Sequence, residues 1–128
     1  MIYIFFRTIA NAVKEAKMNV GIDIEEVERF VKYAKDKSYL ERIFSKEEIA
    51  YSIPKKNVSQ HLAVRFAAKE AVWKALSAKN KKLFITDISI KNDKNGRPQV
   101  YIKNIKYKKI DISLSHTRKY AAAVAIAF

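Results

Sequence analysis

The sequence contains no cysteine and only two histidines among its 128 residues. Without cysteine it can form no disulfide bond, no thiolate zinc site and no cysteine nucleophile, and two histidines are too few for a histidine-rich metal cage. Any metal must therefore be held mainly by oxygen ligands. Long apolar runs are also absent, since none approaches the roughly 20 residues that a membrane span needs. We expect a soluble, cytoplasmic protein with no membrane partner.

Acidic residues are scarce beside basic ones. The chain has 13 Asp and Glu against 26 Lys and Arg, which gives a formal net charge of +13. A charge of this size bears on partners and solubility rather than on fold. Hydrophobic residues make up 49% of the chain, enough for one core at this length, so the disordered and fibrous classes are excluded. A single domain is predicted.

The first seventeen residues, MIYIFFRTIANAVKEAK, do not fit the rest of the pattern. They resemble a secretory signal only superficially, because no basic region precedes their short apolar stretch. An amphipathic transit peptide is a second interpretation, and translation that begins at Met18 is a third. We treat residues 1–17 as an N-terminal extension and residues 18–128 as the domain.

Periodicity predicts a strand followed by a helix near the start of the domain. Val20, Ile22 and Ile24 recur at every second position, which is typical of a half-buried strand. We expect this strand to end near Asp23. Asp23 could then cap a helix that runs to about Asp36.

Two more helices are expected in the first half of the domain. Ser45 and Glu48 form a capping box at the start of a short helix that Pro54 stops. The longest helix should span about Ser59 to Ser77, because its apolar residues form one stripe and alanines cover another side. Small side chains allow a neighbouring element to approach closely, so this helix should be central and largely buried.

Beyond residue 83 the hydrophobic period changes to two. Asn95-Gly96 lies between two alternating segments and predicts a hairpin, with Pro98 placing the return strand near an edge. Ile110–Ser115 and Tyr120–Phe128 predict a final strand pair. Helices followed by antiparallel strands indicate an α+β domain, an antiparallel sheet with a long central helix.

Three polar features could carry chemistry, and each has an ordinary explanation. Asp23 beside Gly21 fits a helix cap. Glu70 and Lys74 lie one helical turn apart, in the order that suits a simple surface ion pair. His116, in the turn between the last two strands, fits a solvated turn histidine.

Taken together and in order, the segments that hold these residues resemble a known family. GIDIEEVERF, RFAAKEAVWKAL and ISLSHT are similar to the three signature regions of the holo-acyl-carrier-protein synthase family of 4′-phosphopantetheinyl transferases, and DISIKNDKNGRP is similar to its hairpin region. The resemblance covers residues 18–128. It implies the transferase fold and an enzyme of lipid and fatty acid biosynthesis. Such an enzyme moves the phosphopantetheine arm of coenzyme A onto a serine of apo acyl carrier protein and releases adenosine 3′,5′-bisphosphate.

The same resemblance implies roles for five residues. Asp23 and Glu70 would hold a magnesium ion, which typically takes one or two carboxylates together with waters and substrate phosphates. Lys74 would contact the same phosphates, and Arg65 and His116 would lie around coenzyme A. His116 could donate to a phosphate or orient the nucleophile. A magnesium-bound water, Glu70 and His116 all stay open as the general base.

The same resemblance also implies the protein partners of this chain. Acyl carrier proteins are acidic, and Arg29 matches the family's docking arginine, with Lys32 and Lys35 continuing a basic line along the predicted helix. The family assembles as a homotrimer with active sites between subunits. After the long helix this chain reads SAKNKK where the family often has a glycine-rich turn, so its lysines form either a solvated loop or a contact to the 3′-phosphate.

A nucleic-acid-binding module is the rival from another class. The net charge and the basic segment 102–109, in which Tyr107 could stack on a base, favour it. An ordinary charged loop explains that segment equally well, and the module gives no reason for Asp23 and Glu70. We therefore predict no nucleic-acid partner; binding to DNA cellulose that survives moderate salt would revive the rival.

Overall fold

The structure is a computed structural model and describes residues 17–128. The predicted extension, residues 1–17, lies outside the described residues except for its last member. No helix within residues 17–128 is long and apolar enough to cross a membrane. The elements, in chain order, are β1 (Asn19–Glu26), α2 (Arg29–Tyr33), α3 (Lys37–Ile43), α4 (Lys46–Ser52), α5 (Val58–Leu76), the 3₁₀ turn η1 (Ile85–Asp87), β2 (Ile88–Asn92), β3 (Pro98–Ile102), β4 (Ile105–Lys106), β5 (Ile110–His116) and β6 (Tyr120–Ala127).

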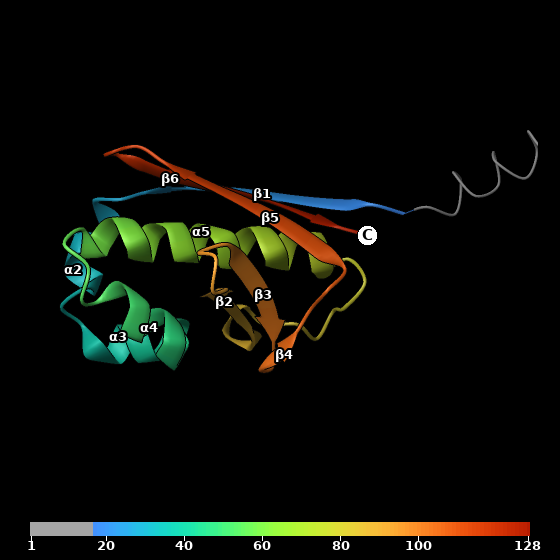
Figure 1. Ribbon diagram of the computed structural model, residues 1–128, viewed down its shortest axis with the longest axis horizontal. Helices are drawn as coiled ribbons and strands as arrows, with labels where there is room; N and C mark the ends of the chain where they lie inside the picture. The colour runs from blue at the N-terminus through green and yellow to red at the C-terminus, as the bar shows by residue number, and fades with distance from the viewer. Residues whose placement is uncertain (1–16) are drawn as a thin grey trace, which may run out of the picture.

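Helix α5 runs through the middle of the molecule (Figure 1). One antiparallel sheet, in the order β1-β6-β5, covers one side of it. The short helices α2 to α4 and a second antiparallel sheet, β2-β3-β4, lie on the other side. The predicted α+β class and the long central helix are confirmed, with two small sheets in place of one.

Small residues explain how closely β1 lies on α5. Five alanines of the helix are fully buried, at positions 63, 67, 68, 71 and 75. Gly21 of β1 faces this surface so closely that a Cβ at Gly21 would collide with the carbonyl oxygen of Ala71. The glycine therefore brings the strand against the helix, and with it Asp23, which lies on the same face of β1 two residues later.

A helix does follow the first strand, as predicted, but it is shorter than the range Asp23–Asp36: it forms only as α2, Arg29–Tyr33, and its predicted start at Asp23 is wrong. Strand β1 continues to Glu26, because pairing with β6 reaches from Asn19 to Glu26 and places Asp23 opposite Ala123. Asp23 therefore caps no helix. The capping aspartate of this region is Asp36, whose carboxylate accepts a hydrogen bond of 3.0 Å from the backbone N–H of Tyr39 at the start of α3.

Two local predictions are confirmed by backbone geometry. The capping box at the start of α4 is complete, since Ser45 and Glu48 each accept a hydrogen bond from the other's backbone N–H. Between β2 and β3, Gly96 adopts a φ of 79°, the left-handed conformation that glycine favours in such turns.

The edge position predicted for the strand of Pro98 is wrong for the strand as a whole. Strand β3 lies between β2 and β4. Strand β4, however, pairs only with the far end of β3, at Tyr101 and Ile102, so Pro98 needs no N–H toward it. The turn from β3 to β4 is formed by Lys103 and Asn104, which adopt positive φ values of 49° and 68°.

Candidate active site

Asp23 and Lys74 form the centre of the candidate site, at the contact of β1 with α5. The Lys74 ammonium donates to Asp23 Oδ1 over 3.1 Å and to the carbonyl oxygen of Ile22 over 2.9 Å. The other carboxylate oxygen of Asp23, Oδ2, is buried and has no hydrogen-bond partner. A buried carboxylate oxygen without a partner carries a desolvation cost, so this group suits a cation ligand.

Glu70 belongs to the same group. It lies one helical turn before Lys74 on α5, where burial and the charge of Asp23 raise its pKa, while Lys74 and Arg29 lower it. The charge of Asp23 thus acts on Glu70 across the contact of β1 with α5. The structure thus brings together Asp23, Glu70 and Lys74, the three residues that the sequence assigns to the metal and the phosphates.

Glu25 is a third carboxylate here that the sequence analysis did not identify. It follows Asp23 by two positions in β1 and so lies on the same face of the strand. Burial, together with the adjacent Asp23, raises the pKa of Glu25 to about 7. Arg29 pairs with it, Nη1 to Oε2, over 2.8 Å. The two-residue alternation of the strand was the signal that could have found it.

These carboxylates do not form a complete metal cage on their own. No group of three or more His, Cys, Asp or Glu side chains within residues 17–128 is arranged to hold a metal ion. A cation bound here must take its remaining ligands from water or substrate. Magnesium commonly does so, because it retains several waters and uses only one or two protein carboxylates.

Arg65 and His116 line a separate pocket of about 390 Å³. Arg65 is only 5% exposed, and its Nη2 donates to Asn92 Oδ1 over 3.0 Å. Its guanidinium lies over the Tyr51 ring, 4.5 Å from the centroid, and its Nε is buried without a partner. A buried guanidinium with a free donor suits an anion such as a phosphate.

The same pocket contains basic residues that the sequence analysis missed. His61 precedes Arg65 by one turn of α5, and burial together with the charges of Arg65 and Lys55 lowers the pKa of His61. Arg97, from the turn between β2 and β3, lines the pocket as well. The one-turn spacing could have indicated His61, whereas the hairpin's position over α5 is a matter of tertiary structure.

The two groups of predicted residues do not meet within one chain. Asp23 of β1 is paired to Ala123, and His116 of β5 is paired to Ala121, so strand β6 separates them. Two strand spacings amount to about 10 Å. Neither Asp23 nor Glu70 lines the pocket of Arg65 and His116. A single chain therefore presents a carboxylate pair and an anion pocket side by side.

The predicted docking residues lie on α2. Arg29 is already engaged with Glu25, and its guanidinium also lies over the rings of Phe30 and Phe66, 5.5 and 5.3 Å from their centroids. Lys32 is exposed, with its ammonium 5.1 Å from the centroid of Tyr33. Arg29 is thus positioned between the surface of α2 and the carboxylate group.

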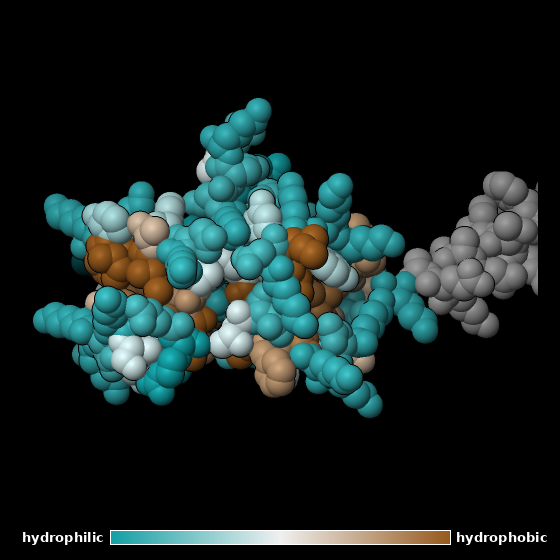
Figure 2. Space-filling view, turned by 90° about the horizontal axis from the view of Figure 1, so that it is seen from below, coloured by the Kyte–Doolittle hydropathy of each residue, from teal (hydrophilic) through white to brown (hydrophobic). Residues whose placement is uncertain are grey.

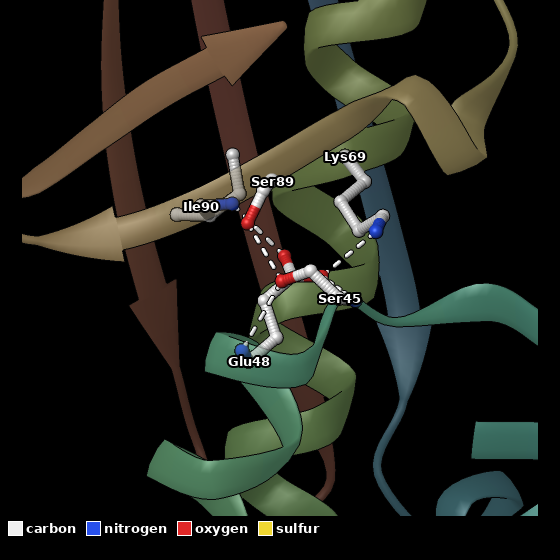
Figure 3. Close-up of polar contacts among 5 residues, drawn as sticks. All are labelled: Ser45, Glu48, Lys69, Ser89 and Ile90. Carbon is white, nitrogen blue, oxygen red and sulfur yellow. Dashed lines mark hydrogen bonds and ion pairs between the residues drawn. The ribbon is translucent and has the colours of Figure 1, made fainter. Parts of the chain in front are cut away.

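Glu48, which the sequence analysis interpreted only as part of a capping box, belongs to a second acid–base pair with Lys69 of α5. Glu48 and Lys69 are both fully buried and form an ion pair of 2.8 Å (Figure 3). Glu48 also accepts hydrogen bonds from the backbone N–H groups of Ser45 and Ile90, and Ser45 Oγ lies 2.6 Å from Ser89 Oγ. The network joins α4, α5 and β2.

Comparison with known proteins shows one consistent family. Residues 19–125 match the model of the 4′-phosphopantetheinyl transferase superfamily. The chain is 43% identical over 118 residues to a holo-acyl-carrier-protein synthase of Treponema denticola, covering 85% of this chain and 96% of that protein. It is 35% identical over 111 residues to the synthase of Bacillus subtilis, covering 84% and 92%.

Solved structures agree with the sequence matches. A holo-acyl-carrier-protein synthase of Bacillus anthracis in complex with coenzyme A aligns with a TM-score of 0.71 at 30% identity, over 87% of this chain and 97% of that one. The Helicobacter pylori synthase in complex with coenzyme A aligns with a TM-score of 0.71 at 32% identity, over 85% and 99%.

Proposed function

The chain belongs to the 4′-phosphopantetheinyl transferase superfamily and transfers the phosphopantetheine arm of coenzyme A to apo acyl carrier protein, and we propose that it does so with a magnesium ion held by Asp23 and Glu70. The observation that carries this proposal is the position of Asp23 on β1 against α5, where it contacts Lys74 and its charge acts on Glu70. The buried, unpartnered Oδ2 of Asp23 supports it, as does the raised pKa of Glu70. A bound cation would relieve both costs.

The chemistry requires neutralisation of negative charge. Bound magnesium would offset the charge that builds on the pyrophosphate oxygens while the carrier serine attacks and adenosine 3′,5′-bisphosphate leaves. Lys74, beside the carboxylates, supplies a second positive charge for these oxygens. Arg65 and His116 provide donors for another phosphate of coenzyme A. Glu70, His116 and a magnesium-bound water are the three candidates to accept the serine proton.

We propose that the working enzyme is a homotrimer formed through the outer face of sheet β1-β6-β5. That face is open along the upper side of the molecule (Figure 1). Val20, Ile22 and Ile24 of β1 are between 63% and 67% exposed there, an arrangement that water disfavours. The opposite side, which includes α3, α4 and β4, carries mainly hydrophilic side chains with small apolar patches (Figure 2).

Assembly would also account for the separation of the two halves of the site. In one chain the carboxylate pair lies apart from the pocket of Arg65 and His116. A neighbouring subunit that packs on β1 could bring its own anion pocket toward Asp23 and Glu70. Sedimentation equilibrium should give three times the chain mass, and Ile22→Asp should reduce both the mass and the activity. A fully active monomer would exclude this arrangement.

The remaining partners follow from the substrates. We propose that apo acyl carrier protein docks on α2 through Arg29 and Lys32, that the enzyme works in the cytoplasm, and that it has no nucleic-acid partner. An acidic carrier accounts for the positive charge of the chain. Tyr107, the aromatic residue offered for base stacking, donates its backbone N–H to the carbonyl oxygen of Val100 and extends the β3–β4 hairpin.

One assay tests the proposed function directly. The protein is mixed with coenzyme A, magnesium and an apo carrier protein, and mass spectrometry records the gain of one phosphopantetheinyl group by the carrier. The gain should disappear with a chelator and return when magnesium is added back. Transfer that continues in the chelator would overturn the role of the metal, and no gain with several carriers would overturn the reaction.

A further inference from the structure

A groove of about 660 Å³ lies beside α2 and belongs neither to the carboxylate group nor to the pocket of Arg65. It is bounded by α2, the connection between α4 and α5, and the turn between β5 and β6, all at one end of the molecule (Figure 1). Its lining residues are Val27, Val31, Ala34, Lys35, Ile53, Lys56, Asn57, Val58, Ser59, Gln60 and Arg118.

The groove combines an apolar floor with a positive rim. Val31 and Ile53 remain 50% and 41% exposed, which is unusual for branched apolar side chains so close together. Three cations surround them, Lys35, Lys56 and Arg118, and no carboxylate lines the groove. None of these three cations takes part in an ion pair within residues 17–128.

This charge pattern differs from that of the other face of α2. There, Arg29 is paired with Glu25, so part of its charge is already compensated within the chain. The cations of the groove form no such ion pair. Glu26 and Glu28 line the adjoining hollows, but Arg29, Lys32 and Lys119 line them as well, so positive charge remains in excess around the groove. Apolar contact surrounded by an excess of positive charge suits an acidic protein surface that also has exposed apolar side chains.

The position of the groove connects docking with chemistry. Val31 lies on the proposed docking helix, and Arg118 follows His116 by two residues in the turn between β5 and β6. Gln60 lines both the groove and the pocket of His116, and its side chain donates to the carbonyl oxygen of Thr117 over 3.2 Å. The groove therefore adjoins the proposed docking helix on one side and the turn that follows His116 on the other.

We propose that the groove around Val31 and Ile53 is a second docking surface for the acyl carrier protein, with Lys35, Lys56 and Arg118 recognising its acidic side chains. This rests on the proposed docking at α2. The groove extends the contact beyond Arg29 and Lys32. The excess of positive charge around it contributes both to the rate of encounter and to the orientation of the bound carrier.

The test measures carrier binding apart from catalysis. Fluorescence anisotropy of a labelled apo carrier protein, without coenzyme A, gives the Kd for the wild type, for Lys35→Glu/Lys56→Glu and for Lys108→Glu/Lys106→Glu. The last variant makes the same change of charge near β4, at the opposite end of the molecule (Figure 1). The groove variant should weaken binding by about tenfold or more, and the control by much less. The difference should shrink in about 0.5 M salt, where charge interactions are screened.

Steady-state kinetics then exclude the other occupants of the groove. The KM for carrier should rise in the groove variant while the KM for coenzyme A stays unchanged. A rise confined to coenzyme A would assign the groove to the nucleotide and overturn the proposal. A change in oligomeric mass would assign it to a subunit contact and also overturn it. Equal weakening of carrier binding by the control variant would show that only the net charge of the protein matters, and would also overturn the proposal.

A second variant tests the apolar floor. Ile53→Ser keeps every charge and should weaken carrier binding at low and high salt alike, because the lost contact is apolar. Unchanged binding by Ile53→Ser would contradict the docking surface as drawn. Failure of the proposed function is a separate result, since it would appear as no phosphopantetheinyl transfer by the wild type itself.

Discussion

Helix α5 carries two neighbouring acid–base groups, Lys69 with Glu48 on one side and Glu70 and Lys74 with Asp23 on the other. In the first, both side chains are fully buried and 2.8 Å apart. In the second, Lys74 remains 45% exposed, and its contact with Asp23 is 3.1 Å long. Lys69 and Glu70 are consecutive residues of α5, yet the surroundings of the two groups differ.

The state of the carboxylate oxygens distinguishes their roles. Glu48 uses both oxygens, one for Lys69 and the backbone of Ser45 and the other for the backbone of Ile90. Asp23 leaves Oδ2 buried without a partner. A fully satisfied buried pair holds elements together, whereas an unsatisfied carboxylate beside another carboxylate is costly without a ligand. We therefore propose that the first group stabilises the fold and that the second acts in catalysis.

The largest effect is expected from breaking the buried pair. Lys69→Met leaves the carboxylate of Glu48 buried without its counter-charge, which should cost about 3–5 kcal/mol of unfolding free energy. Urea unfolding followed by circular dichroism measures the loss. Lys69→Met combined with Glu48→Gln should recover part of the stability, because no uncompensated charge remains, while one backbone N–H that a Glu48 oxygen accepts from loses its acceptor. No recovery in the double variant would contradict a purely electrostatic origin of the loss.

Next is the loss of the proposed metal ligand. Asp23→Asn removes the negative charge that holds a hard cation and should reduce kcat/KM on the order of 100-fold or more, with little change in melting temperature. Glu70→Gln should behave alike. Calorimetry should show that magnesium-dependent binding of coenzyme A is lost in both. Near-normal turnover in either variant would refute that carboxylate's assignment to the metal.

Gly21→Ala should disturb the group of Asp23, Glu70 and Lys74 but not the pair of Glu48 and Lys69, because only the first depends on how β1 packs on α5. The added Cβ would push β1 away from Ala71 and move Asp23 relative to Glu70, at a cost of about 1–3 kcal/mol in stability. Glu48 and Lys69 lie outside this contact, so the melting transition should remain cooperative. Activity of the folded variant, measured well below its melting temperature, should fall. Full activity there would show that the strand–helix distance does not position the site.

Arg29→Glu tests the link from α2 to the carboxylate group. Reversal of the charge should raise the KM for acidic carrier protein about tenfold, with a smaller change for coenzyme A. Because Arg29 also pairs with Glu25, Arg29→Gln serves as the matched variant without a new negative charge. Equal changes in both KM values would indicate a folding defect instead of docking.

The smallest effect is expected at the aspartate that does cap a helix. Asn caps about as well as Asp, so Asp36→Asn should change the unfolding free energy by only a few tenths of a kcal/mol and leave turnover unchanged. It is the control for Asp23→Asn, since both replace one carboxylate by an amide. If Asp36→Asn reduced turnover as much as Asp23→Asn, the loss at Asp23 could not be attributed to a metal ligand.

Short segments of the sequence predicted which side chains come together in the candidate site, but not what surrounds them. Asp23, Glu70 and Lys74 lie in signature segments and do come together. The helix start expected at Asp23 was wrong, because a cap is a local preference and eight residues of pairing with β6 outweigh it. Glu25 and His61 were missed, since their significance depends on which side chains face them from other elements.

The sequence by itself determined the features that depend on residues a few positions apart. The capping box of Ser45 and Glu48, the turn at Gly96 and the extent of α5 are of this kind, because their interactions span at most a few residues. Only the tertiary structure decided that Glu48 is buried against Lys69 and Ile90, 21 and 42 residues away, while Asp23 meets Lys74 across 51 residues. Burial and counter-charges set the energy of an ionised group, and both are supplied by distant segments that fold against it.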